Sequence, residues 1–257
     1  MLSKNLLRPD VAEDETMEDL QLQGLRLIQK KKAFRFGMDS VLLADFAGIR
    51  PDDTVTDLGC GNGILPILLK GRNKGKLFFA VEIMPEAAKL AERNMILNGL
   101  EKDVIVITAD ASDVGRYIAS CSVDAVVCNP PYGPPEASLT SPNKEKARAR
   151  SQQADTLDRF FAGAFTILKG KGKIFLVYPA PQMLSVMKKL QEHHLEPKRF
   201  RLVYPCENKA ANLVLIEAVK DAKPTLHPLP PLIVYNPDGS LTKELKSVYH
   251  IEEQTGF

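Results

Sequence analysis

The hydrophobic and polar positions of this chain change their period along its length. From residue 51 on, short apolar runs typical of buried parallel strands alternate with segments that have one apolar helical face, which predicts an α/β fold with a mostly parallel sheet. The predicted strands are 55–58, 76–81, 104–108, 124–128, 172–178, 199–204 and 212–219. The predicted helices are 64–70, 86–98, 113–119, 157–168 and 183–193. No helix separates the last two strands, so we expect a hairpin and an antiparallel final strand.

The first residues carry a different pattern. Residues 1–19 are mostly polar with an acidic cluster and predict a solvated or partly disordered lead-in. Apolar and polar residues then alternate over 20–29, and a basic tripeptide at 30–32 separates them from a second short run at 33–36. This arrangement predicts a β-hairpin with a basic turn.

A helix over 41–48 is expected next, capped by Asp39 or Ser40. Residues from 222 to 237 are Pro-rich and apolar, which predicts an extended arm before a last short helix over 241–249. The predicted organisation is an N-terminal extension at 1–50, a core domain at 51–220, and a C-terminal arm with a short helix at 221–257.

Composition and charge narrow the class of protein. The 257 residues are 44% hydrophobic and 26% charged, values of an ordinary globular chain, and the net charge of +2 means that an anionic partner must bind local basic patches. The 4 cysteines form no C-x-x-C pair, and Cys60 and Cys128 lie in apolar contexts, which predicts buried thiols in a reducing compartment and no metal site. No signal peptide or membrane span is found, so a cytoplasmic protein is expected, as a monomer or weak homodimer.

The stretch Asn129-Pro130-Pro131-Tyr132 follows the apolar run 124–128. Its two prolines lack a backbone N–H and favour extended backbone, so the turn offers acceptors, namely the Asn129 amide oxygen and the Pro130 carbonyl. Tyr132 adds a flat aromatic face. Acceptors beside a stacking surface suit a planar group with an amino donor, such as the exocyclic amine of adenine, although an ordinary strand-to-loop turn has the same pattern.

A glycine-rich turn, Asp57–Gly63, lies between the predicted strand 55–58 and the predicted helix 64–70. Such a βα unit binds nucleotides, because glycines let the backbone approach a ligand and the helix N-terminus offers free N–H groups. Glu82 ends the next predicted strand, about 20 residues beyond the loop, where a carboxylate accepts hydrogen bonds from both ribose hydroxyls. A solvated strand end is the alternative for Glu82, and the spacing favours the ribose role.

The glycine loop also favours one class of cofactor. A dinucleotide loop reads G-x-G-x-x-G and binds a pyrophosphate, whereas this loop reads G-x-G-x-G directly after Asp57. A carboxylate at that position suits a cation better than a phosphate. S-adenosylmethionine carries an ammonium and a sulfonium and no phosphate, so the loop favours it over a nicotinamide cofactor.

Polar residues follow the carboxyl ends of successive predicted strands: Asp57, Glu82, Asp110 and Asn129. In an open α/β sheet, ligands bind outside the carboxyl ends of the strands, so we expect these side chains to share one site. Asp110 can accept a hydrogen bond from the adenine amino group of the cofactor, or it can cap the predicted helix 113–119. The sequence leaves both roles open.

Together these motifs resemble those of class I S-adenosylmethionine-dependent methyltransferases with an Asn-Pro-Pro-Tyr motif. Within that class, the chain is most similar to the bacterial valine-tRNA adenine N6-methyltransferase group, which modifies the purine next to the anticodon. The similarity covers nearly the whole chain, and the segments that carry it are 34–43, 57–63, 129–132, 144–150 and 229–236.

The resemblance implies a Rossmann-like seven-stranded methyltransferase sheet, helices on both faces, and N6-methylation of adenine in RNA, in the first place tRNA near the anticodon. It implies that the target base is held by Asn129, Pro130, Pro131 and Tyr132. The residues it implies for S-adenosylmethionine are Gly37, Met38, Asp39, Asp57, Gly59, Cys60, Gly61, Asn62, Gly63, Glu82, Ile83, Asp110, Ala111 and Asn129.

The segment 133–153 is polar and irregular, which predicts a long loop. It contains four basic residues and one acid, Glu145; the basic residues are Lys144, Lys146, Arg148 and Arg150. Beside the proposed catalytic turn, such a loop can close over RNA phosphates. A solvated helix face is the alternative.

Other functions stay open on the sequence alone. The same turn can present a guanine N2 of rRNA or a glutamine amide of a protein to the methyl donor. A nicotinamide-dependent oxidoreductase and an RNA-binding protein that only retains the fold are further alternatives. The basic segment, without a separate peptide-binding domain, favours an RNA substrate.

Overall fold

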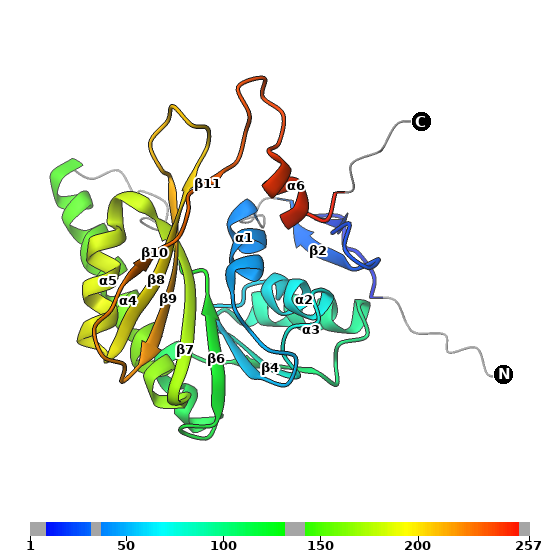
Figure 1. Cartoon of the computed structure of the whole chain (residues 1–257). Coiled ribbons are helices and arrows are strands. Elements are labelled where there is room, and N and C mark those ends of the chain that lie inside the picture. Colours follow the sequence, from blue (N-terminus) through cyan, green and yellow to red (C-terminus); the bar gives the residue numbers. More distant parts are fainter. Residues whose placement is uncertain (1–8, 32–36, 132–141, 252–257) are drawn as a thin grey trace.

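The computed structural model describes residues 9–31, 37–131 and 142–251, with side chains from residue 155 on in the last range. Its main strands are β3 (Thr54–Leu58), β4 (Leu77–Glu82), β5 (Val104–Thr108), β6 (Val123–Cys128), β7 (Leu168–Pro179), β8 (Leu195–Tyr204) and β9 (Leu213–Lys220). They form one twisted sheet in the order β8-β9-β7-β6-β3-β4-β5 (Figure 1). The predicted α/β fold is confirmed.

The direction of each strand follows from its connection. The five strands from β5 to β7 pair in parallel, whereas β9 pairs antiparallel with both β7 and β8. The predicted hairpin at the end of the sheet is therefore confirmed. The C-terminal arm adds two short strands, β10 (His227–Pro228) and β11 (Leu232–Ile233), which pair with β8. They cover what would otherwise be an unpaired edge strand.

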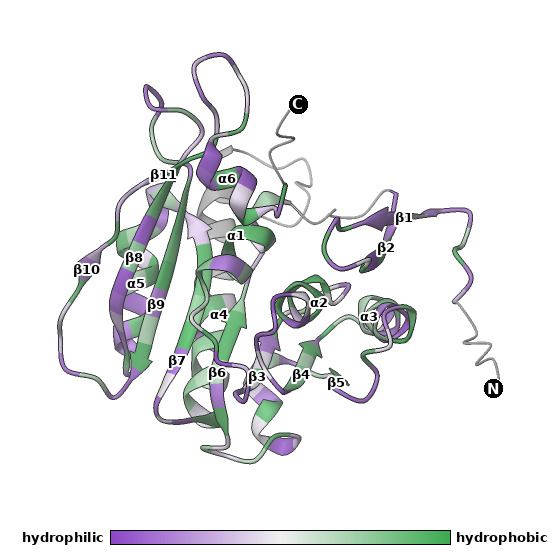
Figure 2. Cartoon of the chain, turned by 45° about the vertical axis from the view of Figure 1, so that its right-hand side comes forward, coloured by the Kyte–Doolittle hydropathy of each residue, from purple (hydrophilic) through white to green (hydrophobic). Residues whose placement is uncertain are grey.

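Helices cover both faces of the sheet. On one face lie α1 (Met38–Phe46), α2 (Ile64–Gly71), α3 (Pro85–Leu97) and α6 (Lys243–Val248). On the other lie the 3₁₀ helix η1 (Ala111–Arg116), α4 (Pro142–Ile167) and α5 (Met183–Glu192). Alternate residues of β6 serve the two cores, with Val127 on the first face and Val126 and Cys128 on the second. In Figure 2 much of β6 and β7 has the colour of hydrophobic residues.

The N-terminal hairpin differs from the prediction. Its strands are β1 (Glu15–Asp19) and β2 (Arg26–Lys30), so the acidic segment is a strand from Glu15 on, whereas residues 10–14 before it are exposed and lie in no helix or strand. The alternating residues at 20–25 form the turn, where Gln21, Gln23 and Gly24 take positive φ. Leu22 of this turn is buried, so its apolar side chain serves packing on α2 and not a strand. The predicted strand 33–36 lies outside the described residues.

Helix α1 begins three residues earlier than predicted, and neither Asp39 nor Ser40 caps it. Gly37 is the N-cap and makes no side-chain cap hydrogen bond, while Asp39 and Ser40 lie in the first turn. The apolar pattern begins at Val41 and the helix is buried from Ser40 on, in both cases later than where the helix starts.

The predicted loop at 133–153 is wrong in its second half, because α4 begins at Pro142. Proline suits the first turn of a helix, and the following residues are good helix formers without glycine. These residues have no apolar helical face, so their hydrophobic pattern predicts a loop. In Figure 1 this first part of α4 extends past the end of the sheet.

Among the described residues, none of the helices is both long and apolar enough to span a lipid bilayer.

Candidate active site

The ends of four parallel strands lie at one edge of the sheet. Leu58 at the end of β3 is in register with Val81 on one side and Cys128 on the other. Glu82 is in register with Thr108, the last residue of β5. The structure therefore brings the residues that end or follow these strands to one rim, as expected: Asp57, Glu82, Asp110 and Asn129.

The glycine loop after β3 is held on one side and open on the other. Gly59, Gly61 and Gly63 have φ of +75°, +54° and +82°, the left-handed region that favours glycine. A Cβ on Gly59 would lie 2.8 Å from Phe160 Cζ, and one on Gly63 would lie 2.5 Å from Met95 Cε. A Cβ on Gly61 would meet no described atom within 4 Å, so at Gly61 the backbone is accessible to a ligand.

Glu82 supports the loop from the end of β4. Its Oε2 accepts from the Gly61 N–H at 2.9 Å, and its Oε1 accepts from the Met84 N–H at 2.9 Å. Each carboxylate oxygen has a second lone pair, so two further hydroxyl donors can bind. Ile83 beside it is 56% exposed, which leaves an apolar side chain at the same rim.

Asp57 is fully buried beneath the loop. Neither carboxylate oxygen has a hydrogen-bond partner among the described residues. Burial, and then the nearby Glu82 carboxylate, raise the pKa of Asp57 well above its usual value. A buried carboxylate without a donor is costly, and a cation placed at the loop would lower that cost.

The cysteines of the site are inert. Burial, followed by Asp57 and Glu82, raises the pKa of the Cys60 thiol, and burial raises that of Cys128. Both are free and buried, as predicted. The described residues contain no group of three or more His, Cys, Asp or Glu that could hold a metal ion.

Asp110 caps the start of a helix, which is one of the two roles that the sequence left open. Its Oδ1 accepts from the Ser112 N–H at 2.9 Å at the start of η1, and its Oδ2 accepts from Arg159 at 2.9 Å. Burial raises the pKa of Asp110, but the Ser112 and Arg159 hydrogen bonds outweigh it, so the pKa is lowered. Ala111 is buried beside it, where Gly163 of α4 lets that helix approach, since a Cβ there would lie 2.1 Å from the Ala111 carbonyl oxygen.

Asn129 emerges at the end of β6 and remains partly exposed. Its Nδ2 donates to Ser40 Oγ at 3.2 Å, which places the first turn of α1 beside the end of β6. Gly37, Met38 and Asp39 belong to this turn or precede it directly. Pro130 is buried and Pro131 is exposed, while Tyr132 lies outside the described residues.

Two buried polar residues next to the site were not assigned to it by the sequence analysis, which gave one of them, Ser40, only a helix-capping role. Asn94 of α3 is fully buried; its Nδ2 donates to the Asn62 carbonyl of the glycine loop and to the Ile28 carbonyl, both at 2.9 Å. It thus connects the N-terminal hairpin to the loop. A signal exists, because Asn94 lies on the same helical face as Leu90 and Ala91. Ser40 is the second, a polar residue in the apolar run of α1.

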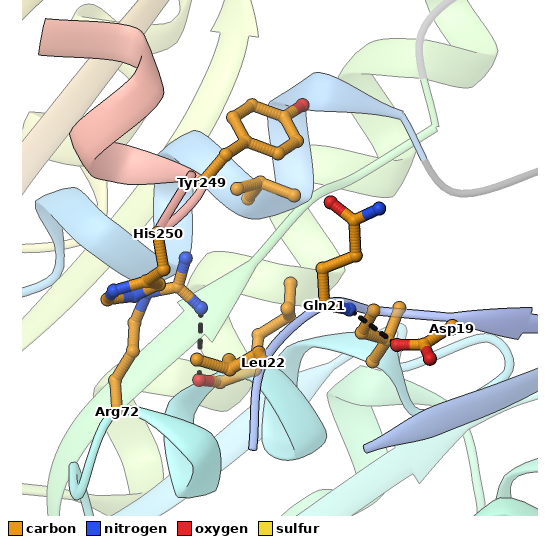
Figure 3. Close-up of a pocket in the computed structure, with 9 residues that line it drawn as sticks. Asp19, Gln21, Leu22, Arg72, Tyr249 and His250 are labelled. Carbon is orange, nitrogen blue, oxygen red and sulfur yellow. Dashed lines mark hydrogen bonds between the residues drawn. The ribbon is translucent and has the colours of Figure 1, made fainter. Parts of the chain in front are cut away.

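A separate cavity of about 140 Å³ lies where the hairpin turn, α1, α2 and the end of α6 meet (Figure 3). Its lining comes from the hairpin turn, α1, α2 and the end of α6: Asp19, Leu20, Gln21, Leu22, Val41, Leu68, Arg72, Tyr249 and His250. Arg72 holds two of these parts together, since it donates to the carbonyls of Leu68 at 3.2 Å and Val248 at 2.9 Å. None of the expected site residues lines this cavity.

Comparison with known proteins decides the family. Residues 37–199 match the family described as "Methyltransferase small domain". The chain belongs to this family. The expectation of a methyltransferase is confirmed, and the site at the strand ends lies within the matched residues.

Relatives and solved structures agree with this family. The chain is 26% identical over 201 residues to "tRNA1(Val) (adenine(37)-N6)-methyltransferase" of Aliivibrio salmonicida, covering 78% of this chain and 83% of that protein. It is 32% identical over 166 residues to the protein of the same name in Haemophilus influenzae, covering 63% of this chain and 69% of that protein. A predicted O-methyltransferase of Agrobacterium tumefaciens has the same fold, with a TM-score of 0.66, 19% identity, and coverage of 83% and 96%. So does M. jannaschii TYW2 in complex with AdoMet, with a TM-score of 0.54, 18% identity, and coverage of 82% and 88%.

The methyltransferase site fits the cofactor expected from the sequence. S-adenosylmethionine needs acceptors for its ribose hydroxyls, a carboxylate for its positive charge, and backbone that lets it approach. The groups in the structure that match these needs are Glu82, the Asp57 carboxylate, which has no partner among the described residues, and the open side of Gly61.

Proposed function

We propose that this methyltransferase transfers the methyl group of S-adenosylmethionine to N6 of an adenine in tRNA, next to the anticodon. The observation that carries the proposal is the position of Asn129, whose amide lies at the end of β6, on the rim shared with the glycine loop. The relatives named as tRNA adenine N6-methyltransferases support this substrate at 24–32% identity.

S-adenosylmethionine supplies a methyl group on a sulfonium, which is electrophilic and needs no activation. The nucleophile is the weak point, since the lone pair of the adenine amine is delocalised into the ring. The Asn129 amide oxygen and the Pro130 carbonyl accept the two N–H groups of that amine, which increases electron density on nitrogen and directs it. Because Pro130 and Pro131 have no N–H, neither proline offers a backbone donor that would compete with the amine. The protein thus contributes positioning, and the product loses its extra proton to water.

The remaining residues have supporting roles in the proposal. Glu82 binds the ribose hydroxyls, Asp57 lies toward the positive charge of the cofactor, and Ile83 packs on its adenine ring. Asp110 and Ala111 border the adenine, although in the structure the Asp110 carboxylate also serves Ser112 and Arg159. Tyr132 stacks on the target base.

The first part of α4 is proposed to contact the RNA. Residues Lys144, Lys146, Arg148 and Arg150 fall within its helical backbone, and their side chains lie outside the described part of the chain. The helix is anchored near the site because Arg159 pairs with Asp110 at 2.9 Å. We expect the basic end of the same helix to contact the phosphates of an anticodon loop, where a base is easier to unstack than in duplex DNA.

The test is a methylation assay with cellular RNA. RNA from cells that lack the protein is incubated with the purified enzyme and methyl-labelled S-adenosylmethionine, then digested to nucleosides for mass spectrometry. The expected product is labelled N6-methyladenosine in the tRNA fraction. Label in guanosine or in protein glutamine would replace the proposed substrate with one of the alternatives, and no label in any fraction would reject the proposal.

A further inference from the structure

Two asparagines of α3 pair with the outer edge of the N-terminal hairpin. Strand β2 pairs with β1 on one side, and on its other side it faces two side-chain amides of α3. Asn94 Oδ1 accepts from the Ile28 N–H at 2.7 Å, and Asn94 Nδ2 donates to the Ile28 carbonyl at 2.9 Å. Asn98 makes the same pair of hydrogen bonds with Arg26, at 2.9 and 2.8 Å.

The spacing of these residues explains the fit. Alternate residues of a strand present their backbone groups on the same edge about 7 Å apart, and residues four positions apart in a helix lie about 6 Å apart along its axis. Asn94 and Asn98 therefore each offer β2 a donor and an acceptor, as a neighbouring strand would. Because the partners are backbone N–H and carbonyl groups, only one orientation of each amide satisfies them. The outer edge of β2 is thereby covered.

Asn94 also reaches the glycine loop after β3. Its Nδ2 donates a further hydrogen bond, at 2.9 Å, to the Asn62 carbonyl, and the Asn94 side chain is fully buried. Helix α3 packs closely on this part of the loop, since a Cβ on Gly63 would lie 3.3 Å from Ala91 Cβ. Glu82 holds the loop from β4 through the Gly61 N–H. The loop is therefore supported by β4 and by α3.

One buried amide thus holds both the hairpin and the loop that is the proposed site of S-adenosylmethionine. We propose that Asn94 is a positioning residue for the cofactor, through which docking of the hairpin and binding of S-adenosylmethionine favour each other. Asn98 holds the same strand but makes no hydrogen bond to the loop within the described residues. The inference rests on the cofactor site of the proposed function and not on its RNA substrate.

Two matched variants separate the loop contact from hairpin docking. Asn94→Ala removes the bonds to β2 and to the loop, whereas Asn98→Ala removes the equivalent pair of bonds to β2 and none to the loop. The ion pair of Arg93 with Glu15, at 2.8 Å, still links α3 to the hairpin in both variants. Calorimetry with S-adenosylmethionine gives the Kd of each variant, and thermal unfolding without cofactor gives its melting temperature.

Asn94→Ala is expected to raise the Kd for S-adenosylmethionine about 5-fold or more, because the loop loses its support at Asn62. Asn98→Ala is expected to keep the Kd within about twofold of wild type. Both should lower the melting temperature, since each leaves backbone groups of β2 without a partner. A wild-type Kd in the Asn94 variant would overturn the proposal, and so would an equal loss of affinity in both variants.

Hydrogen exchange in the wild-type enzyme tests the same coupling without a substitution. Coupling is reciprocal, so bound S-adenosylmethionine should slow exchange of the Ile28 amide about 5-fold or more. The Cys121 amide, which donates to the Thr166 carbonyl at 3.1 Å before the amino end of β6, is the control and should exchange equally fast with and without cofactor. An unchanged rate at Ile28, or equal slowing at both amides, would overturn the proposal. If these tests succeed but the enzyme methylates no adenine, the proposed function fails while the coupling stands.

Discussion

The backbone N–H of Gly61 donates to Glu82 Oε2 at 2.9 Å across 21 positions of the chain. The open end of the glycine loop and the carboxylate that ends β4 are thus one structural unit. Because Gly61 is the loop glycine with free space beside it, a ligand that reaches the loop also reaches Glu82.

Replacing Glu82 by alanine should weaken S-adenosylmethionine binding by at least about 10-fold, because hydrogen bonds to a charged acceptor and the support of the loop are lost together. Calorimetric titration of the free enzyme measures this. Glu86→Ala is the matched control, since that carboxylate lies on the exposed first turn of α3, with a side chain 86% exposed. Equal affinity of the Glu82 and Glu86 variants would contradict the ribose role.

Asp57 should make the stability of the ligand-free enzyme depend on pH. Burial raises the pKa of Asp57 in the folded state. Its contribution to folding stability is therefore fully present below the usual pKa of 3.8 and is lost as the pH rises through the pKa of the folded state. The side chain of Asp57→Asn stays neutral at every pH. The stability of this variant relative to wild type should therefore rise as the pH is raised from 5 to 9, a range of roughly four units. Melting temperatures of both proteins across this range measure the difference.

With S-adenosylmethionine present, the comparison should reverse, because a cation beside Asp57 favours the charged carboxylate. Wild type should then bind the cofactor more tightly than Asp57→Asn at pH values where the carboxylate is ionised. The prediction would be contradicted if the melting temperatures of the two proteins changed with pH in the same way without cofactor and both proteins bound S-adenosylmethionine equally well. Ionisation of Asp57 would then affect neither stability nor cofactor binding.

The N-terminal hairpin should be held by Glu15. Its carboxylate lies 2.8 Å from Arg93 of α3 and also accepts from the Ala12 N–H at 2.9 Å; against the opposing effect of burial, the Arg93 hydrogen bond above all lowers its pKa from 4.5 to about 2. A lowered pKa stabilises the fold above pH 4.5, and this stabilisation is lost as the pH falls toward 2. Glu15→Gln should therefore lower the free energy of unfolding by about 2 kcal/mol at neutral pH.

Denaturant unfolding at neutral pH and at acidic pH tests this prediction. The exposed Glu13→Gln variant is the control and should unfold like wild type. If the Glu15 variant lost as much stability relative to wild type under strongly acidic conditions as at neutral pH, the ion pair with Arg93 would not be the cause.

Neutralising the basic quartet of α4 should weaken RNA binding and flatten its salt dependence. Replacement of Lys144, Lys146, Arg148 and Arg150 by glutamine removes four charges, and the slope of log K against log salt should fall by up to about three units if all four contact phosphates. Binding of tRNA at several salt concentrations gives the slope. A variant with glutamine at four exposed positions elsewhere, Lys76, Lys89, Lys102 and Lys188, has the same net charge and should keep the wild-type slope. An identical slope in both variants would remove α4 from the RNA surface.

The parallel core was predictable because its signals are local. The run Val126–Cys128 is apolar at every position, as a strand buried on both faces must be, and the polar residue after it marks the rim. For Glu82 and Asn129, the chain order of the strands was enough to place both side chains at the same edge of the sheet.

Other parts depend on contacts that sequence spacing does not reveal. Leu22 alternates with polar residues like a strand position, but it lies in a turn because α2 offers it a buried surface. Glu15 reads as a solvated acid, but Arg93, 78 positions away, makes its burial favourable together with Lys30 and the Ala12 N–H. Ser40 likewise has the sequence position of a helix cap. Its partner Asn129 follows a strand and lies 89 positions further on, so the sequence gives no sign of the contact.

In the proposed reaction, the amide of Asn129 serves the target amine on a rim shared with the methyl-donor site. The measurement that tests it most directly is single-turnover methylation of tRNA by Asn129→Ala, together with its affinity for S-adenosylmethionine. We predict a rate reduced by at least about 100-fold with the Kd for the cofactor within a few-fold of wild type. A near wild-type rate in this variant would contradict the account.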